Sequence, residues 1–287
     1  MSFLARANKK GVRAGAVVVA SATAVAATAW GVAVLVGPGG SAASQQNVAR
    51  PGGGDDGRPG QQPGKIPEGI AHASESGGDA VNITIDDGPD PRWTPKVLDV
   101  LRRHEVKATF CMVGPQAKAH PDLVKKVVAA GHRLCDHTMN HDTAMDKKPV
   151  AYQEAQILEA KKLIEEAAGG GAKVEYYRAP GGAFTPDSRR IAAAHGMRPL
   201  GWNVDTKDFD KPGTAAIVNA VKREIGNGPT VLFHDGGGNR AQTVDALDQV
   251  LTWLKEQGRP TGFPVRTAPE PREAPGASDA GTASDAH

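Results

Sequence analysis

The sequence predicts an α/β fold with a mostly parallel sheet, and two observations favour a closed barrel over an open, doubly wound sheet. Between about residues 80 and 265, short β-rich segments alternate with amphipathic segments roughly six or seven times, which is typical of strands covered by helices. Clusters of polar residues follow five of the expected strands. Because the carboxyl ends of parallel strands face one way, such clusters converge more easily at a barrel mouth than at one switch point.

The elements follow from hydrophobic periodicity and from helix start and stop residues. We expect strands at residues 80–86, 107–113, 132–136, 175–178, 199–204 and 230–233, and residues 263–265 are a candidate to close the sheet. The first helix starts at Thr94 and Pro95, and the longest covers residues 150–168. The other helices start at Pro121, at Thr185–Pro186, at Thr214 and near Gln242.

The N-terminal residues predict export. A basic patch (Arg6, Lys9, Lys10 and Arg13) precedes an uncharged, apolar run from about residue 14 to residue 36. This run is about long enough to span a bilayer, but its many small residues make it a weak span. Residues 1–37 are therefore either a signal peptide or a membrane anchor, and the rest of the chain is exported in both cases.

Composition separates the remaining domains. Residues 38–78 are rich in Gly, Pro, Ser and Gln and predict a flexible linker, residues 79–267 predict one folded domain, and residues 268–287 predict a disordered tail. The 34 Lys and Arg nearly balance the 32 Asp and Glu, so no basic surface indicates nucleic-acid binding. We expect a monomer that contacts the membrane only if the N-terminal segment stays uncleaved.

The two cysteines leave two alternatives open. Cys111 and Cys135 lie in strand-like runs and lack the spacing of a metal site such as C-x-x-C. An exported protein could join them in one disulfide between neighbouring strands, but two reduced core cysteines fit the sequence equally well.

The first candidate site is the pair Asp86–Asp87, which ends the first expected strand and is followed by the turn residues Gly88 and Pro89. Such a tripeptide alone more often fills an ordinary loop. Adjacent residues of an extended chain point to opposite sides. The turn must therefore redirect one carboxylate if both are to serve one site.

The second candidate site is His137–Thr138–Met139–Asn140–His141, in which two imidazoles lie four residues apart. In a helical turn this spacing places both on one face as a chelating pair. With Asp87 as third ligand, two histidines and one carboxylate match a catalytic site for zinc, and Co²⁺ or Ni²⁺ would also fit.

Three further residues end or follow expected strands, namely Arg178, Asp208 and His234. Taken singly, each would by default be an ion pair, a cap or a structural histidine. Their common position at strand ends makes them candidates for one site.

Taken in this order, the segments resemble the polysaccharide deacetylases of carbohydrate esterase family 4, which are defined by the NodB homology domain. The T-F-D-D-G motif corresponds to residues 84–88, the H-S/T-x-x-H motif to residues 137–141, and the R-x-P-Y-G motif to residues 178–182. D-x-x-D-W corresponds less closely to residues 205–209, and L-x-H corresponds to residues 232–234. The resemblance covers about residues 80–265 and implies an irregular (β/α) barrel of seven or eight parallel strands.

The resemblance also implies roles for the site residues in removing acetyl groups from N-acetylated sugars of a polysaccharide. Asp86 would be the general base and His234 the general acid. Asp87, His137 and His141 would bind the metal. Asp208 would orient His234, Arg178 would orient Asp86, and the backbone N–H of Gly181 would stabilise the oxyanion.

Two residues depart from the family pattern. Gly181 stands where the family usually has Tyr, and Phe209 stands where it usually has Trp. Gly181 keeps the backbone donor and Phe209 keeps an apolar wall, so both changes would reshape the sugar groove without removing a catalytic group. The alternatives are a cell-surface carbohydrate-binding protein with a vestigial site and an O-acetyl xylan esterase. A serine hydrolase is excluded because no G-x-S-x-G nucleophile elbow occurs.

Overall fold

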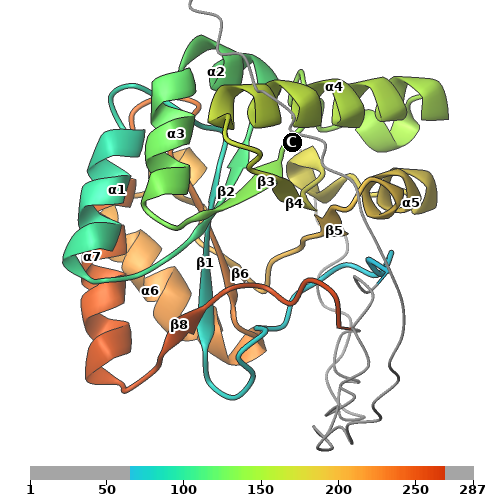
Figure 1. The fold of residues 1–287 in the computed structure, drawn as a ribbon. Helices are drawn as coiled ribbons and strands as arrows, with labels where there is room; N and C mark the ends of the chain where they lie inside the picture. The colour runs from blue at the N-terminus through green and yellow to red at the C-terminus, as the bar shows by residue number, and fades with distance from the viewer. Residues whose placement is uncertain (1–64, 269–287) are drawn as a thin grey trace, which may run out of the picture. The chain divides into compact units, whose positions relative to one another are not determined.

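The fold is a single curled sheet of parallel strands with helices on its outer face, as a computed structural model of residues 65–268 shows (Figure 1). The eight strands run in the order β5-β4-β3-β2-β1-β7-β6, and β8 also pairs with β1. The predicted irregular barrel of seven or eight parallel strands is confirmed. The strands are β1 (Val81–Asp86), β2 (Thr109–Met112), β3 (Arg133–Asp136), β4 (Val174–Tyr177), β5 (Arg198–Pro199), β6 (Val204–Asp205), β7 (Thr230–His234) and β8 (Thr261–Gly262).

Seven α-helices connect these strands within residues 65–268. They are α1 (Thr94–Arg103), α2 (Gly114–Ala119), α3 (Pro121–Ala129), α4 (Val150–Ala168), α5 (Pro186–Ala194), α6 (Thr214–Glu224) and α7 (Ala241–Glu256). The start of α5 shows why the predicted boundaries hold, because the Thr185 hydroxyl accepts a hydrogen bond from the Ser188 N–H while the Ser188 hydroxyl accepts one from the Thr185 N–H. The six-residue helix α2 was not predicted because it is too short to show helical periodicity. No helix within the described residues is long and apolar enough to cross a membrane.

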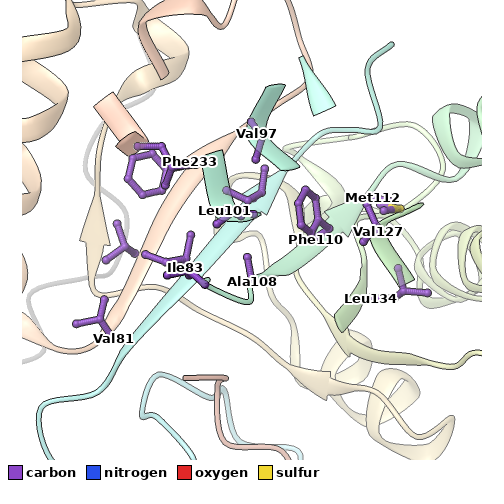
Figure 2. Close-up of a cluster of buried hydrophobic side chains, with 14 of the residues drawn as sticks. Val81, Ile83, Val97, Leu101, Ala108, Phe110, Met112, Val127, Leu134 and Phe233 are labelled. Atoms are coloured by element: carbon purple, nitrogen blue, oxygen red, sulfur yellow. The ribbon is translucent and has the colours of Figure 1, made fainter. Parts of the chain in front are cut away.

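The hydrophobic core lies between the sheet and the helices. On β1, Val81 and Ile83 belong to this core (Figure 2), and so does Ile85. The alternate residues of β1, which include Thr84 and Asp86, point to the inner face of the curled sheet. Every residue of β1 is buried, but only its outer face is apolar. The inner face is therefore free to carry polar chemistry.

A disulfide crosses the inner face. Cys111 on β2 and Cys135 on β3 are register partners in neighbouring strands, and their sulfurs are joined. Both are fully buried beside Tyr176 and Leu200. Of the two alternatives that the sequence left open, the structure shows the disulfide.

The prediction of one strand at residues 199–204 is wrong. The chain instead forms β5 beside β4 and β6 beside β7, at the two ends of the strand order. Between them Leu200 bridges Ala71, and Gly201 lies so close to His72 that a Cβ atom would collide with the imidazole. This N-terminal segment holds the chain in a path from one end of the sheet to the other.

The domain boundary predicted at residue 79 is also wrong. Ala71 is fully buried, its N–H donates to Pro199, and its carbonyl oxygen accepts from Gly201. The Ala73 carbonyl oxygen accepts from Val265. Residues 65–78 therefore belong to the folded domain, and composition misled the prediction because Gly and Ser continue into this ordered segment. The predicted signal or anchor, the linker up to residue 64 and the tail beyond residue 268 lie outside the described residues.

The last predicted strand is displaced. Thr261 and Gly262 form β8 beside β1, whereas Pro264 makes only an isolated bridge to Ser74. A proline has no N–H to donate to a strand ladder, which explains why the strand ends before it.

The disulfide predicts a measurable contribution to stability. The two cysteines lie 24 residues apart in the sequence, so their disulfide closes a loop in the unfolded chain. The Cys111→Ala/Cys135→Ala double variant should therefore lose about 3 kcal/mol of unfolding free energy. Chemical denaturation with and without reductant measures the loss. The double variant should be insensitive to reductant, and a wild-type midpoint that is equally insensitive would contradict the prediction.

Candidate active site

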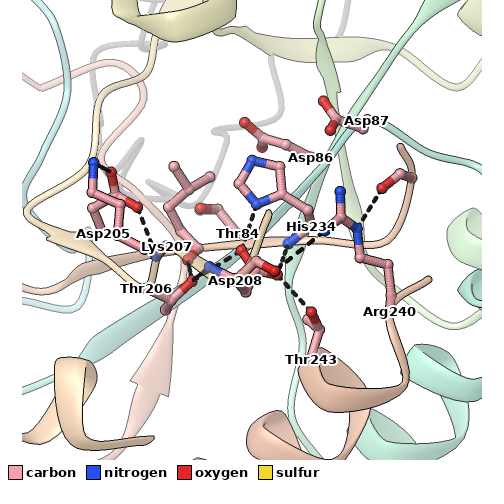
Figure 3. Close-up of polar contacts among 12 residues, drawn as sticks. Thr84, Asp86, Asp87, Asp205, Thr206, Lys207, Asp208, His234, Arg240 and Thr243 are labelled. Carbon is pink, nitrogen blue, oxygen red and sulfur yellow. Dashed lines mark hydrogen bonds and ion pairs between the residues drawn. The ribbon is translucent and has the colours of Figure 1, made fainter. Parts of the chain in front are cut away.

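Polar side chains meet at the carboxyl ends of neighbouring strands, on the inner face of the sheet. Asp86 ends β1 and His234 ends β7, and the two residues are register partners. His137 and Arg178 directly follow β3 and β4. Figure 3 shows Asp86 and Asp87 above the imidazole of His234, with Asp208 below it. The structure thus brings the predicted groups from five parts of the chain together.

The turn after β1 directs both carboxylates to one point. Asp87 has a φ of 78°, in the left-handed region that a residue with a Cβ atom seldom adopts. The Asp87 N–H donates to the Cys111 carbonyl oxygen at 3.1 Å. As a result Asp86 Oδ2 and Asp87 Oδ1 both lie 3.6 Å from His137 Nε2. The turn therefore redirects the Asp87 carboxylate, as predicted for two adjacent carboxylates that serve one site.

Asp87, His137 and His141 form a candidate metal centre. One ligand atom from each lies within 4.8 Å of the others, and His141 Nε2 is 3.2 Å from Asp87 Oδ1. The buried Asp87 Oδ1 has no hydrogen-bond partner. His137 Nδ1 donates to the Arg178 carbonyl oxygen at 2.8 Å, which leaves Nε2 free to bind a cation.

The two histidines meet through a loop and not through the helical turn that their spacing predicted. Thr138 and His141 have positive φ angles of 70° and 50°. The Thr138 N–H donates to Asp136 Oδ1, and the Thr138 hydroxyl accepts from the His141 N–H. The side chains of residues 136 and 138 replace the hydrogen bonds of a helix, and the imidazole centroids lie 4.9 Å apart.

The protonation states favour cation binding. Burial opposes ionisation of Asp87, but the contact with His141 and the charges of His137 and His234 hold its pKa below the ordinary range. Burial lowers the pKa of His137 against the pull of Asp86 and Asp87. An ionised carboxylate and a neutral imidazole are the forms that bind a metal ion. Contact with Asp87 raises the pKa of His141, so a proton competes with the cation there.

Arg178 holds Asp86 in place. Its guanidinium is fully buried, and Nη1 donates to Asp86 Oδ1 at 2.7 Å and to the Thr84 hydroxyl at 2.9 Å. Nε and Nη2 donate to the carbonyl oxygens of Leu200 and Gly201. Every nitrogen of this buried cation has a partner, so Asp86 keeps one oxygen fixed and presents the other to the site.

His234 forms a tight pair with Asp208. Its Nδ1 donates to Asp208 Oδ1 at 2.6 Å, and its backbone N–H donates to Asp208 Oδ2 at 2.9 Å. Burial opposes protonation of His234, but Asp208, Asp87 and Asp86 raise its pKa to about 9. His234 is therefore protonated near neutral pH, and its Nε2 is left to face the site.

The carboxylate of Asp208 is itself fully bonded. Besides His234 it accepts hydrogen bonds from the hydroxyls of Thr206 at 3.1 Å and Thr243 at 2.8 Å (Figure 3). Burial opposes ionisation, but the hydrogen bond and the charge of His234 keep the pKa of Asp208 below its usual value. The pair is thus a carboxylate with an imidazolium.

The two departures from the family pattern lie at the rim. Phe209 has 40% of its surface exposed, and its ring meets that of His234 edge-to-face at a centroid distance of 5.4 Å. Gly181 has a φ of 59° in the turn after β4, and a Cβ atom there would lie 3.3 Å from Thr143. A side chain at residue 181 would thus have to displace the Thr143 methyl group.

Asp205 does not join the cluster, although it follows a predicted strand. Its Oδ1 accepts from the Lys207 N–H, and its Oδ2 lies 3.0 Å from Lys207 Nζ. It shapes the loop that precedes Asp208.

Asp235 and Arg240 were not predicted from the sequence. Asp235 is fully buried, and burial together with Asp87, Asp90 and Asp86 raises its pKa to about 7. Arg240 is buried and donates to the carbonyl oxygens of Gly236 and Asp208. The sequence signal that could have indicated Asp235 is the run of residues 235–238, an aspartate and three glycines directly after His234. This run repeats the carboxylate-and-glycine pattern of residues 86–88.

The sequence is similar to those of known proteins. A family model described as polysaccharide deacetylase matches residues 73–200. A chitooligosaccharide deacetylase of Sinorhizobium fredii is 38% identical over 209 residues, which cover 69% of this chain and 94% of that protein. The chain belongs to the polysaccharide deacetylase family. A second member, a peptidoglycan-N-acetylglucosamine deacetylase of Bacillus cereus, is 40% identical over 62% of this chain and 83% of its own length.

A solved structure of carbohydrate esterase family 4 shares the fold. A pseudoenzyme of carbohydrate esterase family 4 from Bacillus anthracis superposes with a TM-score of 0.60 and 30% identity, over 64% of this chain and 63% of that one. The resemblance in fold is confirmed. Because this family includes a pseudoenzyme, activity has to be argued from the geometry of the site.

The Asp208–His234 pair gives a prediction for pH dependence. In Asp208→Asn the pKa of His234 should fall from about 9 toward its ordinary value of 6.5, because the facing charge is lost. In the wild-type protein the raised pKa of His234 stabilises the folded state. This contribution is fully present below pH 6.5 and disappears as the pH rises through about 9. NMR titration of the His234 imidazole measures the shift. Asp99→Asn, which changes an exposed carboxylate of α1, is the control and should leave the titration unchanged. An Asp208→Asn protein that titrates like wild type would refute the pairing.

Proposed function

We propose that this protein is a metal-dependent hydrolase that removes N-acetyl groups from the amino sugars of a polysaccharide. The observation that carries the proposal is the meeting of Asp86 and Asp87 at His137 Nε2, 3.6 Å from each, with His234 on the neighbouring strand. A base, an acid and a set of metal ligands thus share one site. Family membership supports the same chemistry.

The residues present fit a divalent cation. Asp87 Oδ1 is a buried oxygen without a hydrogen-bond partner, and two imidazole nitrogens face it. Two nitrogens and one carboxylate oxygen suit Zn²⁺ best, and Co²⁺ and Ni²⁺ accept the same donors. When bound, the cation supplies Lewis-acid polarisation of the acetamide carbonyl and makes a water molecule acidic near neutral pH.

Asp86 is proposed as the general base. Arg178 binds its Oδ1 at 2.7 Å, so Oδ2 is the oxygen that can take a proton from the attacking water. Because the guanidinium is fixed by Thr84, Leu200 and Gly201, the carboxylate is held in one orientation before substrate arrives. Such preorganisation removes a cost that a mobile side chain would add to the barrier.

His234 is proposed as the general acid. Asp208 occupies its Nδ1 and stabilises the imidazolium, which leaves the Nε2 proton for the departing amine. A pKa of about 9 keeps the acid loaded near neutral pH. The acid and base thus come from two register partners whose environments differ, since Asp86 faces an arginine and His234 faces a carboxylate.

Gly181 and Phe209 are proposed to contact the substrate. The Gly181 N–H would donate to the oxyanion, and Phe209 would offer its exposed face to a sugar ring beside His234. The relatives are named for chitooligosaccharide and for peptidoglycan N-acetylglucosamine. Peptidoglycan or a chitin-like polymer is accordingly the proposed substrate class, and an O-acetylated xylan is the alternative ester substrate.

The protein is further proposed to act outside the cytoplasm as a monomer, either secreted or attached to the membrane by an uncleaved N-terminal segment. The basic patch and apolar run of residues 1–37 support export. The buried disulfide between Cys111 and Cys135 supports it as well, because disulfides persist in oxidising compartments.

The second candidate function is a carbohydrate-binding protein with a vestigial site, because this family also contains a pseudoenzyme. The two candidate functions differ in whether acetate is released. A binder would retain glycans without releasing acetate. The intact contacts of Asp86 with Arg178 and of His234 with Asp208 favour the enzyme.

The base assignment predicts the effect of Asp86→Asn. Acetate release from N-acetylglucosamine oligomers should fall about 100- to 10,000-fold, because the variant cannot accept a proton. Zinc binding should persist, since Asp86 is not among the three ligands. Asp99→Asn, an exposed carboxylate of α1, is the charge-matched control and should keep wild-type activity. A wild-type protein that binds the oligomers but releases no acetate would favour the vestigial reading.

The ligand assignment predicts how activity depends on metal and on pH. A chelator should abolish acetate release, and Zn²⁺, Co²⁺ or Ni²⁺ should restore it. The affinity for zinc should decrease as the pH falls through the raised pKa of His141, because the proton and the cation compete for the imidazole. Titration with zinc at several pH values measures this. His141→Ala should weaken binding and His104→Ala, whose imidazole contacts Asp248, should not; full activity in the chelated protein would overturn the assignment.

A further inference from the structure

Asp235 is a buried carboxyl that the proposed reaction leaves unused. It follows the proposed acid His234 directly, and none of its surface is exposed. Its N–H donates to the Asp86 carbonyl oxygen at 3.0 Å, which extends the pairing of β7 with β1 by one residue. Asp235 therefore lies against the first residue of the turn that carries the base and the metal ligand.

The carboxyl of Asp235 fills the space under that turn. A Cβ atom at Gly88 would collide with Asp235 Oδ1 and would lie 2.7 Å from its Cγ. On the other side, a Cβ atom at Gly236 would collide with the Asp87 carbonyl oxygen. The absence of side chains at the two glycines lets residues 86–88 and 235–236 pack in direct contact. The backbone on both sides of Asp87 is thus supported by the loop after β7.

Thr94 connects the far end of the turn to the same carboxyl. Its hydroxyl donates to Asp235 Oδ2 at 2.5 Å and accepts from the Asp90 N–H at 2.8 Å. Thr94 is the first residue of α1 and is fully buried. Asp86 and Asp90, the first and last residues of the turn, are therefore both tied to Asp235, one directly and one through Thr94.

The turn needs such support because of its central residue. Asp87 has a φ of 78°, and a residue with a Cβ atom keeps this conformation only where its surroundings enforce it. Asp235 Oδ1 has no hydrogen-bond partner. A buried oxygen without a partner costs stability, and such costs are typical of functional sites.

We propose that Asp235, acting with Thr94, is a positioning residue that holds the Asp86–Asp90 turn so that Asp87 faces the imidazoles of His137 and His141. Asp235 touches neither substrate nor cation in this role. The inference rests on the proposed cation site, and its test reads zinc affinity without requiring activity. Residues that support a ligand of this kind typically change metal affinity by about 10- to 100-fold when they are removed.

The experiment compares variants of the full chain, freed of metal, by competition for Zn²⁺ against a chromophoric chelator. Asp235→Ala should raise the dissociation constant by about 10- to 100-fold. Asp235→Asn should restore most of the affinity, because the amide keeps the shape under Gly88 and an acceptor for Thr94. Val127→Ala removes buried surface from α3, a helix that carries neither the turn nor a ligand residue, and should lower the melting temperature without changing the dissociation constant.

Thr94 supplies a second pair of variants in case Asp235→Ala does not fold. Thr94→Val removes the hydroxyl at nearly constant volume and should weaken zinc binding, whereas Thr94→Ser should bind like wild type. Equal affinities for these two variants, or wild-type affinity in a folded Asp235→Ala, would overturn the proposal. A loss in Asp235→Asn as large as in Asp235→Ala would assign the effect to charge and would overturn it too. A wild-type protein that binds zinc but releases no acetate would refute the proposed function and leave this comparison valid.

Discussion

The buried ion pair between Arg178 and Asp86 is the constraint on which the rest of the site depends. A cation without exposed surface is stable only if its donors are all used. Here the donors connect β1, the end of β4 and the chain after β5. The Arg178 carbonyl oxygen also accepts from His137. One residue thus fixes the proposed base with its side chain and a metal ligand with its backbone, so neither group can shift independently of the other.

The adjacent carboxylates of Asp86 and Asp87 have different surroundings because the backbone becomes left-handed at Asp87. Asp86 continues the alternation of β1 and lies on the inner face of the sheet beside an arginine. Asp87 leaves that alternation through a left-handed conformation and meets two imidazoles. An arginine orients a carboxylate, whereas neutral imidazoles complete a set of cation ligands. The division of roles follows from one backbone angle.

The repeating elements could be predicted from sequence, and the irregular ones could not. The boundaries of α4 and the end of β1 are visible in hydrophobic period and in turn residues. The split at residues 199–204 depends on contacts of Gly201 with His72, which lies far away in the sequence. The positive φ angles of Thr138 and His141 depend on side-chain hydrogen bonds within their loop. The role of Asp235 could not be predicted because its partners, Thr94 and Gly88, lie in the segment after β1, far away in the sequence. Long-range contacts of this kind leave no periodic signal.

The position of the disulfide has a consequence for how the protein can be obtained. Cys111 and Cys135 have no exposed surface. They lie on the inner face of the sheet, where Cys111 is the register partner of Asp86. A small-molecule oxidant in the medium reaches such buried thiols only when the protein opens locally. Material that folds in a reducing cytoplasm would therefore oxidise slowly and incompletely after purification. Homogeneous samples require that oxidation accompanies folding, as it does when a host translocates the nascent chain.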